Sequence, residues 1–168
     1  MQRRTRVLIA VVVGAPVGFL AFVFVAIRTR SPRMLRLVRR FNRAFTNRVQ
    51  RRFAGTPGAA ASLIRHEGRR SRRAYATPIG AFEIEDGFVV TLPYGSTADW
   101  VQNVMAAGSA VLVHEGRTVP VDRPELIRVA EARDWFPASE QRIHRLFRIE
   151  HGLRLHRAPT RDGAPQGI

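Results

Sequence analysis

The chain has 168 residues, which is enough for one ordinary domain and an appendage. It carries 28 basic residues, all of them arginine, against 13 acidic ones, and this excess indicates an anionic partner: nucleic acid, anionic lipid or a multiply charged small molecule. It has no cysteine, which excludes disulfides, thiolate metal sites, iron–sulfur clusters and a cysteine nucleophile.

An uncharged run of 21 residues occupies positions Val7–Ile27. A helix of that length spans a bilayer at about 1.5 Å per residue, so we predict a transmembrane anchor at residues 1–30. The run ends in arginines and not in a small-x-small site, so a cleaved signal peptide is not expected. Three arginines precede the run and seven lie from Arg28 to Arg43. The positive-inside tendency therefore predicts a single-pass protein of the inner or plasma membrane, with its domain on the cytoplasmic side.

A basic amphipathic helix is predicted next, from Ser31 to Phe53. Apolar residues recur there at three- and four-residue spacing between arginines, and Ser31 and Pro32 suit the N-cap and the first turn. Such a helix either lies on an anionic lipid surface or packs its apolar stripe on the following domain. Gly55–Gly58 and the alanines after it indicate a hinge, so residues 31–61 form an amphipathic helix and hinge segment.

Two hairpins identify the strands of the domain, which is predicted to span residues 62–157. The first hairpin is Ala81–Glu85, a type I′ turn sequence Asp86-Gly87, and Phe88–Leu92; the second is Ala110–His114, Glu115-Gly116 and Arg117–Val121. Pro120 lacks a ladder donor, so its strand is expected to be an edge strand or to carry a bulge.

Short helices complete the domain. Ser96-Thr97-Ala98-Asp99 has the spacing of a capping box and Gly108 suits a C-cap, which predicts a helix from about Ala98 to Ala107. The remaining predicted elements are helices at Arg123–Leu126 and Ala138–Glu150, a closing strand at Gly152–Leu155 and a disordered tail at residues 158–168. Hairpins with few helices predict a mainly β (α+β) fold, a small antiparallel barrel and not a doubly wound sheet.

Five arginines lie within nine residues ahead of the first hairpin: Arg65, Arg69, Arg70, Arg72 and Arg73. Arginine pairs bidentately with phosphate or carboxylate, and each such contact contributes roughly 1.5–3 kcal/mol when shielded from water. Gly68 lets the backbone approach closely, and Ser71 with nearby N–H groups can complete an anion nest. A charge run is also typical of a solvated face, and the spacing alone leaves both interpretations open.

Four motifs together resemble the deazaflavin-dependent nitroreductase family. They are His66-x-Gly68-Arg69-Arg70-Ser71, Tyr75-x-Thr77-Pro78, Leu92-Pro93-Tyr94-Gly95 and Asp99-Trp100-x-x-Asn103. The resemblance covers about Ser62 to Leu155. It implies a split β-barrel of the flavin/deazaflavin-binding type, the coenzyme F-420 (8-hydroxy-5-deazaflavin) and oxidoreductase activity.

The resemblance also implies which residues hold the coenzyme. Arg69, Arg70 and Ser71 match the positions that hold its phosphate and oligoglutamate tail. Thr77, Pro78, Pro93, Tyr94 and Gly95 would line the deazaflavin, with Asp99, Trp100 and Asn103 on or beside the following helix. The family usually has a glycine after the serine; here Arg72 either adds an anion contact or blocks the close backbone approach. Trp100 also fits a core position, because it has helical spacing with Val104.

The implied chemistry is hydride transfer, for which a protein supplies binding, orientation and a dry pocket. Tyr94 is the candidate catalytic residue, as a proton donor to the reduced acceptor. The predicted anchor points to a lipophilic acceptor such as a quinone and to anionic membrane lipid as a further partner. Two alternatives are a non-catalytic cofactor- or lipid-binding barrel and a reductase that binds flavin mononucleotide. Few aromatic residues lie beside the arginines, which disfavours a nucleic-acid binder.

The histidines and strand glutamates give weaker signals. His144, His151 and His156 are seven and five residues apart, so no pair shares a helical turn and no metal site is expected. Glu83 and Glu85 alternate with apolar residues on a strand, which predicts that both face solvent.

Overall fold

The computed structural model describes residues 21–29, 31–41 and 52–159. Residues 21–29 are helical, and the helices that follow are α2 (Pro32–Phe41), α4 (Asp99–Ala107), the 3-10 helix η2 (Arg133–Trp135) and α5 (Ala138–Phe147). The strands are β1 (Ser62–Glu67), β2 (Ala74–Ile79), β3 (Ala81–Ile84), β4 (Gly87–Thr91), β5 (Ser109–His114), β6 (Arg117–Arg128) and β7 (His151–Arg157).

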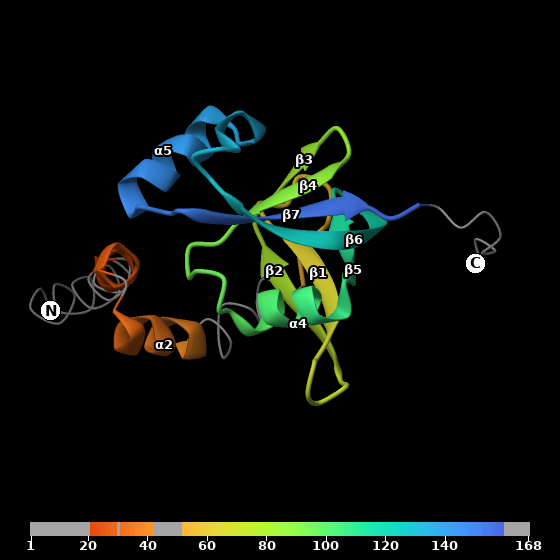
Figure 1. Ribbon diagram of the computed structural model, residues 1–168, viewed down its shortest axis with the longest axis horizontal. Helices are drawn as coiled ribbons and strands as arrows, with labels where there is room; N and C mark the ends of the chain where they lie inside the picture. Colours follow the sequence, from red (N-terminus) through yellow and green to blue (C-terminus); the bar gives the residue numbers. More distant parts are fainter. Residues whose placement is uncertain (1–20, 30, 42–51, 160–168) are drawn as a thin grey trace, which may run out of the picture.

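The seven strands form one antiparallel sheet in the order β2-β1-β5-β6-β7-β4-β3 (Figure 1). β2 and β3 are the two edges of this sheet, yet only Gly80 separates them in the chain. The sheet therefore curls until its edges approach each other at Gly80, and within residues 52–159 no ladder joins them. The mainly β class is confirmed, and the curled half-barrel agrees with the predicted split barrel.

The inside of the curled sheet is filled with apolar side chains. Those no more than 1% exposed are Ile64, Phe88, Val90, Leu112, Val121, Leu153 and Leu155 from the strands and Val101 and Val104 from α4. Burial of one such side chain contributes about 1.5–3 kcal/mol. The interior is therefore a packed core, and a coenzyme-sized ligand has to bind outside it.

A second apolar layer covers the outer face of β3 and β4. Val89 points into this layer while its neighbours Phe88 and Val90 point inward, which explains the unbroken apolar run of β4. The ring of Phe136, which follows η2, packs edge-on against Phe82 at a centroid distance of 5.9 Å. This layer attaches η2 and α5 to the barrel.

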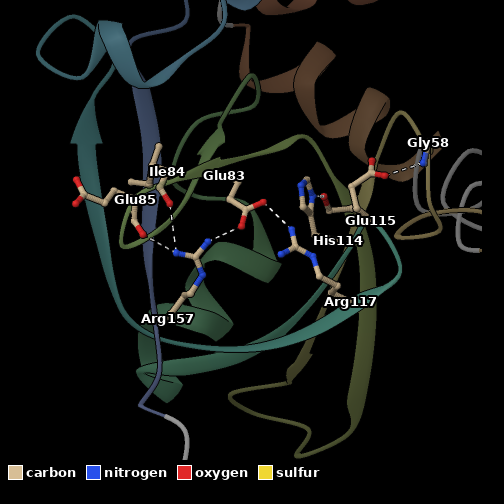
Figure 2. Close-up of polar contacts among 9 residues, drawn as sticks. Gly58, Glu83, Ile84, Glu85, His114, Glu115, Arg117 and Arg157 are labelled. Atoms are coloured by element: carbon tan, nitrogen blue, oxygen red, sulfur yellow. Dashed lines mark hydrogen bonds and ion pairs between the residues drawn. The ribbon is translucent and has the colours of Figure 1, made fainter.

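Glu83 joins three strands at one end of the barrel (Figure 2). Its carboxylate accepts hydrogen bonds from Arg117 Nη2 at 2.7 Å and from Arg157 Nη2 at 2.5 Å. Arg157 also donates to the carbonyl oxygens of Ile84 at 3.3 Å and Glu85 at 2.7 Å. The hydrogen bond from Arg117, followed by that from Arg157, lowers the pKa of the Glu83 carboxyl. The prediction of a plain solvent-facing residue missed these partners.

The second predicted hairpin is confirmed. His114 pairs with Arg117, and the two turn residues between them, Glu115 and Gly116, have φ of 49° and 75°. This turn also holds the segment predicted as a hinge, because Gly116 N donates to the Gly55 carbonyl at 2.6 Å. The carboxylate of Glu115 accepts from a backbone N–H of the same segment at 2.8 Å (Figure 2).

The first hairpin turns one residue earlier than predicted. Ile84 pairs with Gly87, so the turn residues are Glu85 and Asp86, and neither has the positive φ of a type I′ turn. That part of the prediction is wrong. Gly87 lies in β4 because β7 passes so close that a Cβ there would overlap the Leu155 carbonyl oxygen.

Strand β6 decides between the two alternatives for Pro120 and corrects one further prediction. It lies between β5 and β7, so Pro120 is not on an edge strand, and Arg123–Leu126 is strand and not helix. The predicted alternative of a bulge holds, since the register with β7 shifts between Asp122 and Glu125. Pro120 lies opposite Ala158, which follows the last residue of β7, and its carbonyl accepts a hydrogen bond from Ala158 N at 3.0 Å. Pro120 is tolerated there because the ladder beyond the end of β7 no longer requires an N–H from it.

The other two predicted helices of the domain are confirmed with changed ends. α4 ends at Gly108, which has φ of 69°, as expected of a C-cap glycine. The capping box is wrong, because the N-cap residue is Ala98 and no side chain caps it. α5 ends at Phe147 because Arg148 adopts a left-handed φ of 53°. β7 is the predicted closing strand, with wider limits.

The N-terminal elements are described in part. α2 begins at Pro32 as predicted, and Leu35 N donates to the Ser31 carbonyl at 2.9 Å. The expected helix to Phe53 is described only as far as Phe41, since residues 42–51 lie outside the described residues and those from 52 form turns. Most of the predicted membrane anchor and most of the predicted tail also lie outside them. Among the described residues, no helix is both long and apolar enough to cross a membrane.

Candidate functional site

The arginine-rich motif forms the hairpin loop between β1 and β2, residues 68–73, which projects beyond α4 in Figure 1. Gly68 N donates to the Arg73 carbonyl at 2.8 Å, and Arg72 N donates to the Gly68 carbonyl at 2.9 Å. A Cβ at Gly68 would overlap the Ser71 Oγ and crowd the ring of Tyr75. The glycine of the motif is therefore needed for the tight packing of this loop.

Arg69 fastens the loop to α4. Its backbone N–H donates to Asn103 Oδ1 at 3.1 Å and its Nη1 donates to the same oxygen at 2.8 Å. The guanidinium also reaches the first turn of α4, with Nη1 at 3.4 Å from the Asp99 carbonyl and Nη2 at 3.5 Å from the Asp99 carboxylate. The structure thus brings together three predicted site residues, Arg69, Asp99 and Asn103, in direct contact.

Asn103 continues this network into the barrel wall. It is 6% exposed, and its Nδ2 donates to His66 Nδ1 at 3.3 Å. The other ring nitrogen, Nε2, lies 3.2 Å from Thr77 Oγ1. With Nδ1 as acceptor, the proton is on Nε2 and His66 donates to Thr77. Burial lowers the pKa of His66, against a smaller opposing effect of a backbone hydrogen bond at Glu67, so the ring is neutral at pH 7.

Tyr75 closes the other side of the loop. Its ring stacks on His66 at a centroid distance of 5.8 Å, and its hydroxyl lies 3.1 Å from Ser71 Oγ. His66 and Tyr75 are directly opposite each other in the β1–β2 register. Both belong to the motifs, but the sequence analysis assigned them no role. Their equal distance from the intervening loop was the available signal, since a hairpin places such residues opposite one another.

The arginines of the loop divide into two groups. Arg69 is engaged by α4, and Arg72 Nε pairs with Glu67 at 2.9 Å. Arg70 and Arg73 are exposed, and neither guanidinium makes a hydrogen bond or ion pair to the chain in the described ranges. Arg70 and Arg73 are therefore the two cations of this loop that can receive an anion without first breaking an internal contact.

Arg72 adopts a backbone conformation that suits glycine. Its φ is 56°, in the left-handed region, which costs a side-chain-bearing residue roughly 1–2 kcal/mol. The turn therefore favours glycine at this position, and the arginine side chain found there pairs with Glu67 on β1.

The residues predicted to line the coenzyme ring come from two places. Thr77 and Pro78 lie on β2, half-buried. Residues 93–95 lie in the loop from β4 to α4, where Gly95 has φ of 76° and its N–H donates to the Leu92 carbonyl at 2.9 Å. Trp100 is half-buried and packs against the apolar interior, as its core interpretation predicts, and part of its side chain stays exposed beside this loop. α4 links the two places, because that loop leads into the turn that Arg69 contacts.

A second buried polar cluster connects β4 to α5. Thr91 Oγ1 lies 2.8 Å from Glu140 Oε1 and 3.0 Å from His144 Nε2. His144 is 5% exposed, and its Nδ1 has no partner in the part of the chain that the structure describes. Burial lowers the pKa of His144, against the smaller raising effect of Glu140. Both the carboxylate and the hydroxyl approach the same ring nitrogen, which is unlike a nucleophilic triad.

The described surface also has a hollow of about 440 Å³ on the outer side of β6. It is lined by residues of β6, by Trp135 of η2 and by Arg154 of β7. Arg154 lies over the Trp135 ring, 4.7 Å from its centroid, and Arg154 Nη2 pairs with Asp86 at 2.6 Å. None of the predicted coenzyme residues lines this hollow.

No family model matches the chain, and no curated protein matches it. Among solved structures, it is similar to the F-420-H2-dependent reductase FDR-A (14% identity, 58% of this chain and 94% of that chain, TM-score 0.46). It is also similar to a domain-swapped dimer (13%, 75% and 100%, TM-score 0.47) and to a further F-420 reductase (6%, 64% and 92%, TM-score 0.43). Two of these three neighbours are thus F-420-dependent reductases, but identities and TM-scores this low assign no function to this chain.

Replacing Asn103 by alanine removes the acceptor of two Arg69 bonds and the donor to His66. Because buried His66 loses one hydrogen bond and Arg69 loses two, we expect the free energy of unfolding to fall by about 1–3 kcal/mol. Amide hydrogen exchange at Arg69 should also become faster. The matched control is Met105→Ala on the exposed side of α4, which should change stability by less than about 0.5 kcal/mol. Equal effects of the two substitutions would contradict the role of Asn103.

Replacing Arg72 by glycine and by alanine separates backbone strain from the ion pair. Both variants lose the exposed Glu67 contact, but only glycine relieves the left-handed φ. The glycine variant should therefore be more stable than the alanine variant by about 1 kcal/mol in urea unfolding. The same pair of substitutions at Arg70, whose φ is not positive, should give the opposite order. The same order at both positions would show that strain is not the cause.

The two buried histidines predict a loss of stability in mild acid. An unfolded histidine takes up a proton near pH 6.5, whereas His66 and His144 have lowered pKa values in the folded chain. The contribution of the two neutral histidines to the free energy of unfolding should thus be complete above about pH 6.5. The free energy of unfolding should decrease as the pH falls below that value. Urea unfolding at about pH 7.5 and about pH 5.5 measures this decrease. The double variant His66→Gln/His144→Gln should flatten it, and an unchanged slope would refute the assignment.

Proposed function

We propose that this chain is a membrane-anchored oxidoreductase that binds the deazaflavin coenzyme F-420 and reduces a lipophilic acceptor such as a quinone. The observation that carries the proposal is the pair of exposed guanidinium groups of Arg70 and Arg73, which have no partner in the described chain. They lie on a loop whose backbone Asn103 holds in place. Such a loop offers cations in a preorganised position, which reduces the entropy cost of binding an anion.

The chemistry of the loop fits the charged part of the coenzyme. A phosphate and several carboxylates require bidentate cationic donors, and Arg70 and Arg73 are the residues that would hold them. Ser71 would contribute its hydroxyl, which Tyr75 positions at 3.1 Å. Arg69 would act indirectly, since its guanidinium is already engaged by Asp99 and Asn103. This differs from the direct phosphate contact that the resemblance implies for Arg69.

The deazaflavin itself would lie outside the packed barrel. Thr77 and Pro78 on β2 would hold it from one side, and residues 93–95 from the loop before α4. When bound in reduced form, the coenzyme supplies a hydride. Tyr94 would then provide a proton from its phenolic oxygen to the reduced acceptor.

The membrane attachment follows from the apolar run Val7–Ile27 and the arginines after it. Attachment raises the local concentration of acceptors dissolved in the bilayer, which favours a lipophilic substrate such as a quinone. The cytoplasmic orientation gives the domain access to a soluble, polyanionic coenzyme.

The double variant Arg70→Ala/Arg73→Ala tests the proposal. Each lost charge-assisted contact is worth roughly 1.5–3 kcal/mol, so we expect the Kd for the reduced coenzyme to rise at least about tenfold. The measurement is a fluorescence titration of the full chain in detergent. Arg128→Ala is the control, because Arg128 is also exposed but lies on β6, outside the loop, and should leave the Kd unchanged.

The possible results separate the alternatives. No micromolar binding by the wild type, or equal binding by the double variant and the control, would overturn the proposal. Binding of flavin mononucleotide in place of the deazaflavin would identify the other coenzyme. Binding without oxidation of the reduced coenzyme across a panel of quinones and nitroaromatics would point to a non-catalytic barrel.

A further inference from the structure

Helix 21–29 packs against the last turn of α5. The ring of Phe24 contacts the ring of Phe147 edge-on, with centroids 5.2 Å apart. Arg28 Nη1 donates to the carbonyl of Leu146 at 3.4 Å. These contacts join the end of the apolar run to a helix that is more than a hundred residues away in the chain. In Figure 1 both helices lie on one side of the barrel, together with α2.

The outer face of α5 combines two apolar and two basic side chains. Ile143 and Leu146 are 42% and 55% exposed, and Arg142 and Arg145 are exposed beside them. Helical spacing places Arg142, Arg145 and Leu146 on the side of α5 away from buried His144. Ile143 lies at the border of this side, one turn before Phe147, which packs on the second apolar layer. We refer to Arg142, Ile143, Arg145 and Leu146 as the outer face of α5. Single exposed leucines need no explanation, but this combination recurs in helices that lie in the interface of a membrane.

The outer face of α5 carries two positive charges that no described residue neutralises. Neither Arg142 nor Arg145 has a side-chain hydrogen bond or ion pair to the described residues. The one acidic residue of α5, Glu140, is turned away from them toward Thr91 and His144, at 2.8 Å and 3.4 Å. Cationic and apolar groups together match a surface that offers phosphate groups above an apolar layer.

The apolar run that we propose as the membrane anchor ends beside α5, and this position suggests a membrane as the surface. The described residues begin at residue 21, within the apolar run Val7–Ile27, and this end of the run packs on α5. We propose that the outer face of α5 rests on the anionic membrane surface, with Ile143 and Leu146 at the boundary of headgroups and acyl chains and with Arg142 and Arg145 on lipid phosphates. This inference rests on the membrane attachment proposed above and adds a second contact that orients the barrel.

The orientation has a consequence for the candidate site. Thr91, the last residue of β4, bonds to Glu140 and His144 on the inner side of α5. The chain continues from Thr91 directly into the loop that carries Tyr94. A membrane contact on the outer side of α5 would therefore place the start of this loop next to the helix that faces the bilayer, which is the side from which a lipophilic acceptor would come.

The absence of cysteine makes a site-specific test clean. Ile143→Cys in the full chain is labelled with an environment-sensitive fluorophore, and the protein is reconstituted into vesicles with or without about 30% phosphatidylglycerol in phosphatidylcholine. In the anionic vesicles we expect a blue-shifted emission and quenching by headgroup-level spin-labelled lipid. Met105→Cys, 37% exposed on α4, is the matched control and should keep the emission of a label in water. Leu146→Cys repeats the test at a second position of the outer face of α5.

Charge dependence is tested in the same labelled protein. Adding Arg142→Gln/Arg145→Gln should reduce the blue shift in anionic vesicles to the value in phosphatidylcholine alone. Water-like emission at positions 143 and 146 in protein that floats with anionic vesicles would overturn the inference and leave the anchor intact. A blue shift that grows with protein-to-lipid ratio would also overturn it, since a second copy of the chain would then cover the face. Protein that does not float with vesicles would instead refute the membrane attachment of the proposed function.

Discussion

One residue, Gly80, separates the two edge strands of the sheet, and the shape of the domain depends on this short connection. In a flat sheet of seven strands, β2 and β3 would lie about 28 Å apart, at roughly 4.7 Å per strand spacing. The chain from Ile79 to Ala81 covers only about 7 Å even when extended. The sheet therefore has to curl, and its concave side becomes an enclosed volume. Apolar residues at alternate positions of the strands fill that volume, so binding is restricted to the outside.

The outside site depends on the buried amide of Asn103. Its oxygen receives Arg69 from the hairpin loop and its nitrogen reaches His66, so a single side chain fixes loop, strand and helix together. The cost of burying these polar groups is offset because each of them has a partner. The guanidinium groups of Arg70 and Arg73 have no hydrogen-bond or ion-pair partner among the described residues of this held loop. In the proposed site, the loop would thus be preorganised by residues that do not themselves contact the anion.

Much of this arrangement could be predicted from the sequence, and the exceptions have identifiable causes. Short runs rich in apolar and β-branched residues, separated by turn residues, predicted the strands β3 to β5, and Gly108 marked the end of α4. The helix predicted at Arg123–Leu126 failed because Pro124 and the charged residues around it suit a helix start, while pairing with β7 decided the structure. The turn at Glu85 and Asp86 is set by the close approach of β7 to Gly87, which no local pattern reveals.

In the candidate site too, some features could be predicted from the sequence and others are visible only in the structure. The motifs identified its members, and the structure joins Arg69, Asp99 and Asn103 as neighbours. Roles within the motif could not be read from residue type, because arginine is suited equally to an internal contact and to an external anion. Only the hairpin register and the position of α4 distinguish Arg69 from Arg70. The same limit applies to Glu83, whose two arginine partners lie on strands distant in the chain.

The positive charge of the chain is therefore used in different ways in different places. A polyanion in solution could approach any exposed arginine, and net charge alone does not select among them. The hairpin loop provides cations on a backbone fixed by hydrogen bonds, which suits a ligand with phosphate and carboxylate groups at set distances. Arg142 and Arg145 stand beside exposed Ile143 and Leu146, where a soluble anion would gain nothing from the apolar side chains. That difference favours the coenzyme at the loop and the lipid at α5.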